Sequence, residues 1–188
     1  MRPSRPLVAG MLALVAAVAA GCTAEAKSST DTPSPFAGCE GLTGRPAPAA
    51  TTLPDLKLSC FTGKEQVALR SMPGPLIINL WASWCGPCRR ELPLMQKVAS
   101  QTAGQVTVLG VDTGDSREAG ASFAADAGVS FPMLFDPDKK LANAIAGTNL
   151  PITIFVDTSG KSYVNRLPLD AAKLSTLVKQ WAGLTVTP

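Results

Sequence analysis

Apolar runs and polar stretches alternate through most of this 188-residue chain, and their lengths predict its secondary structure. Mostly apolar runs typical of strands occur at 76–80, 106–111, 131–135 and 150–157, and an edge strand is expected at 162–165. Helix-start signals or apolar residues at helical spacing predict helices at 86–102, 116–127, 139–146 and 170–181. Strands that alternate with helices indicate an α/β domain.

A shorter pattern precedes the first long strand. Residues 53–60 alternate apolar and polar side chains, and a similar segment resumes at 65–69 after the turn-like pair Thr62 and Gly63. Two such segments around a turn predict a β-hairpin in front of the main sheet.

The first 21 residues have the pattern of an export signal, because Arg2 and Arg5 precede an apolar run too short to span a bilayer comfortably. The run ends in Ala-Ala-Gly-Cys22, which resembles the lipobox of bacterial lipoproteins. That resemblance implies lipidation of Cys22 and a membrane-anchored extracytoplasmic protein. The alternative is ordinary cleavage and release of a soluble protein. Residues 22–37 predict a flexible tether, and 38–188 the folded domain.

Charge and composition exclude several classes of function. The formal net charge is +3, and without the two leader arginines the chain carries 15 basic and 14 acidic residues. Such a balance gives no reason to expect a nucleic-acid partner. The chain has no histidine, which excludes Cys-His catalysis and histidine metal sites. Because Arg89 follows Cys88, covalent haem attachment is also excluded. We expect no cofactor.

The five cysteines divide by context. Cys22 ends the leader and Cys85 and Cys88 form a close pair, which leaves Cys39 and Cys60. In an exported protein two such cysteines usually form a disulfide, and this one would close a roughly 20-residue loop and contribute about 3 kcal/mol. Two free thiols are the alternative. A zinc site built from four of the cysteines has no support in their spacing, so we expect no metal.

Cys85 stands between a predicted strand and a predicted helix. Unpaired N-H groups and the positive end of the helix dipole favour a thiolate at this position. Cys88, one turn further on, is close enough to form a disulfide with it. Pro87 suits a helix start, and Gly86 keeps the approach to Cys85 free of a side chain. The spacing predicts thiol-disulfide exchange.

These residues carry a family resemblance, which covers roughly residues 52–181. The chain resembles thioredoxins at Trp81, Trp84, Cys85, Gly86, Pro87, Cys88 and Pro93. The sequence Cys-Arg-Arg-Glu-Leu-Pro at 88–93 resembles the membrane-tethered group typified by TlpA, ResA and the thioredoxins of cytochrome c maturation. The resemblance implies a thioredoxin fold, a central mixed sheet flanked by helices, with an added N-terminal hairpin and a central insertion.

The resemblance also implies roles for individual residues. Pro151 stands where the family has a cis-proline beside the active cysteines, and a trans proline at a strand start is the alternative. Trp81 is expected in the core and Trp84 as a partly exposed lip. Glu91 aligns with a buried glutamate that handles the proton of the second cysteine, although an exposed helical glutamate is the commonplace interpretation. One departure is Asn79, where cytoplasmic thioredoxins have a buried aspartate.

Three functions compete on the sequence. The first is an envelope reductase that acts on protein disulfides, including those of apocytochromes, and is re-reduced by a membrane electron carrier. The second is an oxidase that forms disulfides in exported proteins, which would use the same residues. The third is a peroxidase or a redox-inert binding module. The Trp-Cys-Gly-Pro-Cys sequence differs from the Pro-X-X-X-Thr-X-X-Cys setting of peroxiredoxins.

Overall fold

The computed structural model describes residues 34–42 and 51–188, which lie within one compact unit. The predicted signal peptide, the lipidation site Cys22 and most of the predicted tether lie outside the described residues. In the described ranges, no helix combines the length and the apolar character that crossing a membrane requires.

A seven-stranded mixed sheet forms the centre, in the order β2-β1-β5-β4-β3-β6-β7. β3 pairs in parallel with β4 and β4 with β5, whereas β6 pairs antiparallel with both β3 and β7. The strands are β1 (Lys57–Cys60), β2 (Gln66–Ala68), β3 (Leu76–Trp81), β4 (Thr107–Thr113), β5 (Met133–Asp136), β6 (Ile152–Val156) and β7 (Ser162–Asn165). The predicted strands and hairpin are confirmed.

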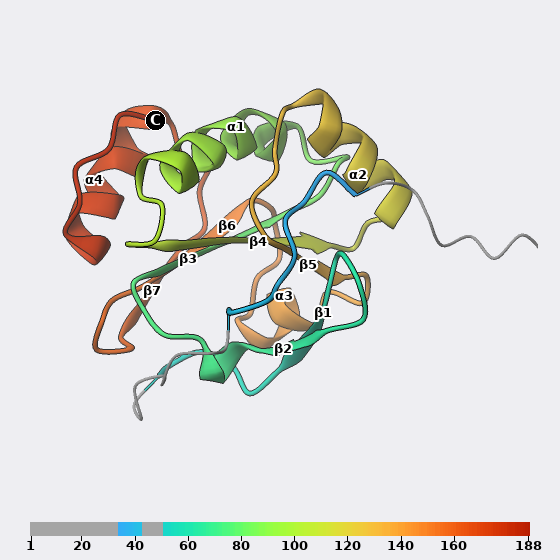
Figure 1. The fold of residues 1–188 in the computed structure, drawn as a ribbon, viewed down its shortest axis with the longest axis horizontal. Coiled ribbons are helices and arrows are strands. Elements are labelled where there is room, and N and C mark those ends of the chain that lie inside the picture. The colour runs from blue at the N-terminus through green and yellow to red at the C-terminus, as the bar shows by residue number, and fades with distance from the viewer. Residues whose placement is uncertain (1–33, 43–50) are drawn as a thin grey trace, which may run out of the picture. The chain divides into compact units, whose positions relative to one another are not determined.

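Helices cover both faces of this sheet. The helices are α1 (Gly86–Gln101), α2 (Arg117–Asp126), α3 (Lys140–Ala144) and α4 (Ala171–Ala182). In Figure 1, α1, α2 and α4 lie on one face and α3 on the other. The starts of α2 and α4 follow their sequence signals, because the side chains of Ser116 and Asp170 accept hydrogen bonds from backbone N-H groups of the first turn.

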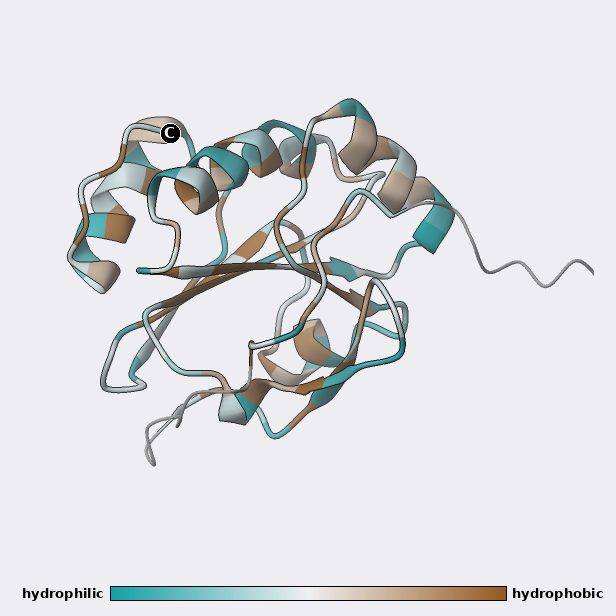
Figure 2. Ribbon diagram, viewed as in Figure 1, coloured by the Kyte–Doolittle hydropathy of each residue, from teal (hydrophilic) through white to brown (hydrophobic). Residues whose placement is uncertain are grey.

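Two apolar cores lie on the two faces of the sheet. The central strands are among the most hydrophobic segments of the domain (Figure 2). Side chains alternate along β3, so Ile77 and Trp81 join the core that contains the buried residues of α1, α2 and α4. Ile78 and Leu80 join the second core, which the hairpin and α3 complete. Every residue of β3 is buried, as expected of a central strand.

The hairpin and the insertion are joined through the sheet. β1 pairs antiparallel with β2 on one side and with β5 of the insertion on the other. The predicted disulfide between Cys39 and Cys60 is confirmed, with Cα atoms 6.0 Å apart and both side chains buried. It ties the segment before the hairpin to the end of β1.

The predicted tether is too long at its C-terminal end. Phe36 is 5% exposed and packs edge-on against Phe61, with ring centroids 4.7 Å apart. The backbone N-H of Ala37 donates to the carbonyl of Ser130 at 2.8 Å. The polar composition of this segment predicts that it buries almost nothing, but one large aromatic ring is enough to anchor it. Packing therefore begins before residue 38.

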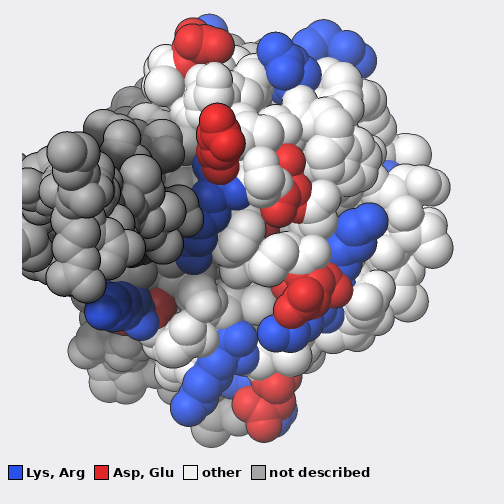
Figure 3. All heavy atoms as spheres, turned by 90° about the vertical axis from the view of Figure 1, so that its right-hand side faces the viewer, with Lys and Arg blue, Asp and Glu red and all other residues white. Residues whose placement is uncertain are grey.

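On the face shown in Figure 3, basic and acidic side chains are interspersed. This face carries no extended field of one sign, which agrees with the near-neutral charge balance of the chain.

Candidate active site

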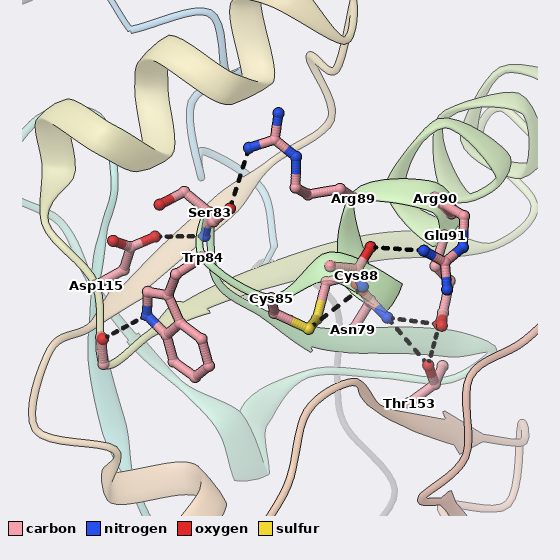
Figure 4. Close-up of a disulfide and its surroundings, with 12 residues drawn as sticks. Asn79, Ser83, Trp84, Cys85, Cys88, Arg89, Arg90, Glu91, Asp115 and Thr153 are labelled. Atoms are coloured by element: carbon pink, nitrogen blue, oxygen red, sulfur yellow. Dashed lines mark hydrogen bonds between the residues drawn. A yellow bond between two sulfur atoms is a disulfide. The ribbon is translucent and has the colours of Figure 1, made fainter.

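Cys85 is the residue that caps α1. The chain leaves β3 at Trp81, turns, and enters the helix at Gly86, so the sulfur of Cys85 accepts a hydrogen bond from the backbone N-H of Cys88 at 3.3 Å (Figure 4). The two cysteines form a disulfide with Cα atoms 5.3 Å apart. Cys85 is 5% exposed and Cys88 is fully buried. An N-H group and the helix dipole would both stabilise a thiolate on Cys85, as the sequence predicts.

The lip around Cys85 is held by the loop after β4. Trp84 is 59% exposed, and its indole N-H donates to the carbonyl of Gly114 at 3.0 Å. One residue earlier, the backbone N-H of Ser83 donates to Asp115 at 2.5 Å, and Arg89 donates to the carbonyl of Ser83 (Figure 4). The exposed lip predicted for Trp84 is confirmed, and its supports are residues that sequence reasoning missed.

Trp81 is fully buried in the core, as predicted. Its indole N-H points to the sulfur of Met133 at 3.0 Å, so the ring contacts β5, the strand of the insertion. Packing is therefore the role that the structure gives to this tryptophan.

Glu91 lies one helical turn beyond Cys88 and is 1% exposed, so the exposed alternative is wrong. Its carboxyl accepts hydrogen bonds from the Asn79 amide at 2.9 Å and the Thr153 hydroxyl at 2.9 Å (Figure 4), and a third from the backbone N-H of Leu169 at 3.1 Å. Burial raises the pKa of the Glu91 carboxyl, and these three donors oppose that rise. None of these three donors is the sulfur of Cys88, so in this oxidised structure Glu91 accepts no hydrogen bond from the active-site pair.

Thr153 is the member of this network that sequence reasoning missed. It pairs directly across from Asn79 in the register of β6 and β3. The signal was present as a lone polar residue in the apolar run Ile-Thr-Ile-Phe-Val, but its meaning depends on the strand register.

A second buried carboxyl, Asp112, was also missed. It is fully buried near the end of β4, and within the described ranges neither oxygen has a hydrogen-bond donor. Burial and the neighbouring Asp115 raise the pKa of Asp112 to about 8, against the opposing charge of Arg117. A protonated Asp112 can donate to Asp115, which an ionised Asp112 cannot.

A groove of about 320 Å³ opens beside Cys85. Four parts of the chain line it: the Trp84–Pro87 turn, Thr113 at the end of β4, the start of α3 at Lys139 and Ala142, and the loop that ends at Leu150. The Leu150–Pro151 peptide bond is cis, as predicted. A side chain at Gly86 would meet no atom within 4 Å, so the glycine leaves this side of the groove open. A disulfide in an extended client segment could thus reach Cys85 between the lip and the loop before Pro151.

Comparison with known proteins agrees with this geometry. Residues 46–162 match the model of the AhpC/TSA family. The chain belongs to this family. It is 32% identical over 112 residues to the thiol-disulfide oxidoreductase ResA of Geobacillus thermodenitrificans, an alignment that covers 59% of this chain and 64% of the relative. It is also 32% identical over 140 residues to the thiol:disulfide interchange protein DsbE homolog of Paracoccus denitrificans, covering 67% and 76%.

A solved structure supports the same fold. Mycobacterium tuberculosis dsbF, determined in mixed oxidised and reduced forms, superposes with a TM-score of 0.64 and 27% identity over 69% of this chain and 99% of that one. The thioredoxin-like fold predicted from the sequence is therefore confirmed.

The sequence alignment with the Geobacillus ResA covers slightly less than two thirds of that relative's own length.

In the part of the chain that the structure describes, no group of three or more cysteine or carboxylate side chains could hold a metal ion.

Proposed function

We propose that this protein is a thiol-disulfide oxidoreductase of the cell envelope that reduces disulfides in extracytoplasmic proteins. The observation that carries the proposal is the Cys85 sulfur at the N-terminus of α1, bonded to the buried Cys88 and open to a groove. The family membership and the names of its relatives support this chemistry.

The reaction begins with the reduced dithiol. The Cys85 thiolate attacks one sulfur of a client disulfide, which forms a mixed disulfide and releases the other client sulfur as a thiolate. The Cys88 thiolate then attacks Cys85, so the second client sulfur leaves and the Cys85–Cys88 disulfide forms. Two electrons pass to the client, and its two thiolates take up two protons.

Glu91 is our candidate for the group that takes the proton from Cys88. A buried carboxyl with a raised pKa holds a proton more readily than an exposed one, and Glu91 shares the buried face of α1 with Cys88. Pro151 and Leu150 would hold the client strand against Cys85, as the resemblance to thioredoxins implies.

Re-reduction requires a dithiol donor. We infer that a membrane electron carrier of the thiol-redox type supplies it, and that disulfides of apocytochromes are among the clients, as the resemblance to the ResA group implies. Lipidation of Cys22 would hold the domain at the membrane. Labelling with palmitate, followed by membrane fractionation, tests the anchor: Cys22→Ala should abolish the label and release the protein, whereas an unlabelled wild type would favour a secreted protein.

The equilibrium reduction potential of the Cys85–Cys88 pair tests the direction of the reaction. Trp81 lies in the same core as both cysteines and Trp84 adjoins Cys85, so tryptophan fluorescence can report a titration against dithiothreitol or glutathione. A potential near about −270 mV or lower supports a reductase, and one near about −120 mV would make the protein an oxidase.

Two matched variants complete the test. The Cys85→Ser/Cys88→Ser double variant retains the Cys39–Cys60 disulfide and should give no transition, which assigns the signal to the active pair. Cys88→Ser should accumulate a mixed disulfide with client peptides. A wild type that reduces neither insulin nor disulfide peptides with dithiothreitol would contradict the proposal and leave a redox-inert module.

A further inference from the structure

The groove beside Cys85 has an uneven charge. Among the described residues that line it, Lys139 is the only charged one, and no carboxylate lines it. The neighbouring Lys140 pairs with Asp138 at 3.1 Å, but Lys139 has no ion-pair partner within residues 34–42 and 51–188. One uncompensated positive charge therefore faces the place where a client must bind.

The backbone fixes where Lys139 starts. This residue caps α3 in the left-handed conformation, with φ 58° and ψ 31°. The carbonyl of Asp136 accepts its backbone N-H at 3.1 Å, and the carboxylate of Asp136 accepts those of Lys140 and Leu141 at 2.8 and 2.9 Å. Because Asp136 belongs to β5, the turn that presents Lys139 is tied to the sheet.

The side chain of Lys139 then crosses to the lip of the active site. A Cβ placed on Gly114 would lie 2.2 Å from its Cε, so the lysine stem occupies the space that glycine leaves. Its ammonium group lies 5.9 Å from the ring centroid of Trp84. The cation is thus held between the insertion and the lip, where an ammonium on a ring face is favoured.

The other charged side chains near Cys85 are the cations of Arg89 and Arg90 and the carboxylate of Asp115, and none of the three lines the groove. Arg89 and Arg90 are exposed on the first turns of α1. The nearby carboxylate of Asp115 accepts the backbone N-H groups of Ser83 and Ser116. The chain as a whole is close to neutral, so this local excess of cations is a property of the site.

We propose that Lys139 is a specificity-determining residue that favours client segments carrying a carboxylate side chain within a few residues of the reacting cysteine. The inference rests on the proposed disulfide exchange and names the clients for which that exchange is fastest. Opposite charges at a partly exposed contact change a rate by about threefold to fivefold, and salt screens the effect.

The test uses three disulfide-bonded peptides that differ only beside the cysteine, with Glu, Gln or Lys at that position. The second-order rate of their reduction by the reduced protein is measured at low and high salt. For the wild type we expect the Glu peptide to react about threefold to fivefold faster than the Gln peptide, and the Lys peptide more slowly than both. The ratio should approach one in high salt.

Variants assign the preference to one side chain. Lys139→Gln should bring the Glu-to-Gln rate ratio close to one, Lys139→Glu should invert it, and Lys139→Arg should retain it. Lys173→Gln is the matched control, since Lys173 is exposed on α4 and outside the groove lining, and its ratio should match that of the wild type. Because each ratio is taken within one variant, a general loss of activity does not mimic the result.

Two failures remain distinguishable. A wild type that reduces all three peptides at equal rates, or a Lys139→Gln variant that keeps the wild-type ratio, overturns the assignment of Lys139 and leaves the redox function intact. A wild type that reduces none of the peptides overturns the proposed function.

Discussion

Asp112 offers the sharpest test of the electrostatics beside the active site. It is fully buried and, when ionised, has no hydrogen-bond donor in the described part of the chain. Its pKa is raised from an ordinary 3.8 to about 8, chiefly by burial and secondarily by Asp115. Asp112→Asn keeps the shape of the side chain and removes the ionisation. It should therefore stabilise the domain at alkaline pH.

The sign follows from the proton balance. Between pH 3.8 and about pH 8, the folded state keeps a proton on Asp112 that the unfolded state has released. The free energy of unfolding is therefore highest, as far as Asp112 is concerned, below about pH 4, and it falls as the pH rises to about 8. A tenfold difference in acidity between the folded and unfolded states corresponds to about 1.36 kcal/mol, so the total loss approaches about 5 kcal/mol by pH 8. Between pH 5 and pH 8 the loss is about 4 kcal/mol.

Urea unfolding of the oxidised soluble domain at pH 5, 6.5 and 8 measures this loss. The wild type should lose stability steeply over that range, and Asp112→Asn should lose much less, with the remainder from groups such as Glu91. Asp126→Asn, an exposed carboxyl at the far end of α2, is the control and should follow the wild type. Parallel pH profiles for wild type and Asp112→Asn would refute the reasoning.

Three further changes test other parts of the structure. Cys39→Ser/Cys60→Ser should lower the free energy of unfolding by about 3 kcal/mol, since the disulfide spans 21 residues, and an unchanged urea midpoint would contradict a structural role. Glu91→Gln should slow resolution of the mixed disulfide about tenfold or more near neutral pH and remove one inflection from its pH profile; an unaltered profile in stopped-flow assays would exclude a proton-handling role. Phe36→Ala should lower the free energy of unfolding by about 3 kcal/mol, measured by thermal or urea unfolding. A loss below about 0.5 kcal/mol would show that Phe36 does not anchor this segment and belongs to the tether.

Features that depend on neighbouring residues in sequence could be predicted. The start of α1 at the Cys-Gly-Pro-Cys motif needs only local signals, and the same is true of the caps at Ser116 and Asp170. The Cys39–Cys60 disulfide followed from counting cysteines in an exported chain, without knowledge of their positions.

Features that depend on strand register could not be predicted. Asp112 sits in register with Trp81 on β3 and Phe135 on β5, which buries a residue that the sequence shows only as an acidic position after an apolar run. A second difference is local: the sequence predicts Lys139 as the first residue of a helix, whereas in the structure it is the helix cap in a left-handed conformation and lines the groove. Neither position is marked by composition or periodicity.

The Asn at position 79 illustrates how register changes the meaning of a residue. Taken alone, it is a departure from the buried aspartate that cytoplasmic thioredoxins have at this position. In the structure its amide donates both to Glu91 at 2.9 Å and to the Thr153 hydroxyl at 3.0 Å, bonds that an ionised aspartate could not make. An aspartate here would instead place a second carboxyl against Glu91, and two such groups resist joint ionisation. Asn79 and Glu91 are therefore complementary: the single buried carboxyl of this network comes from the helix that carries Cys88, and the strand supplies its donor.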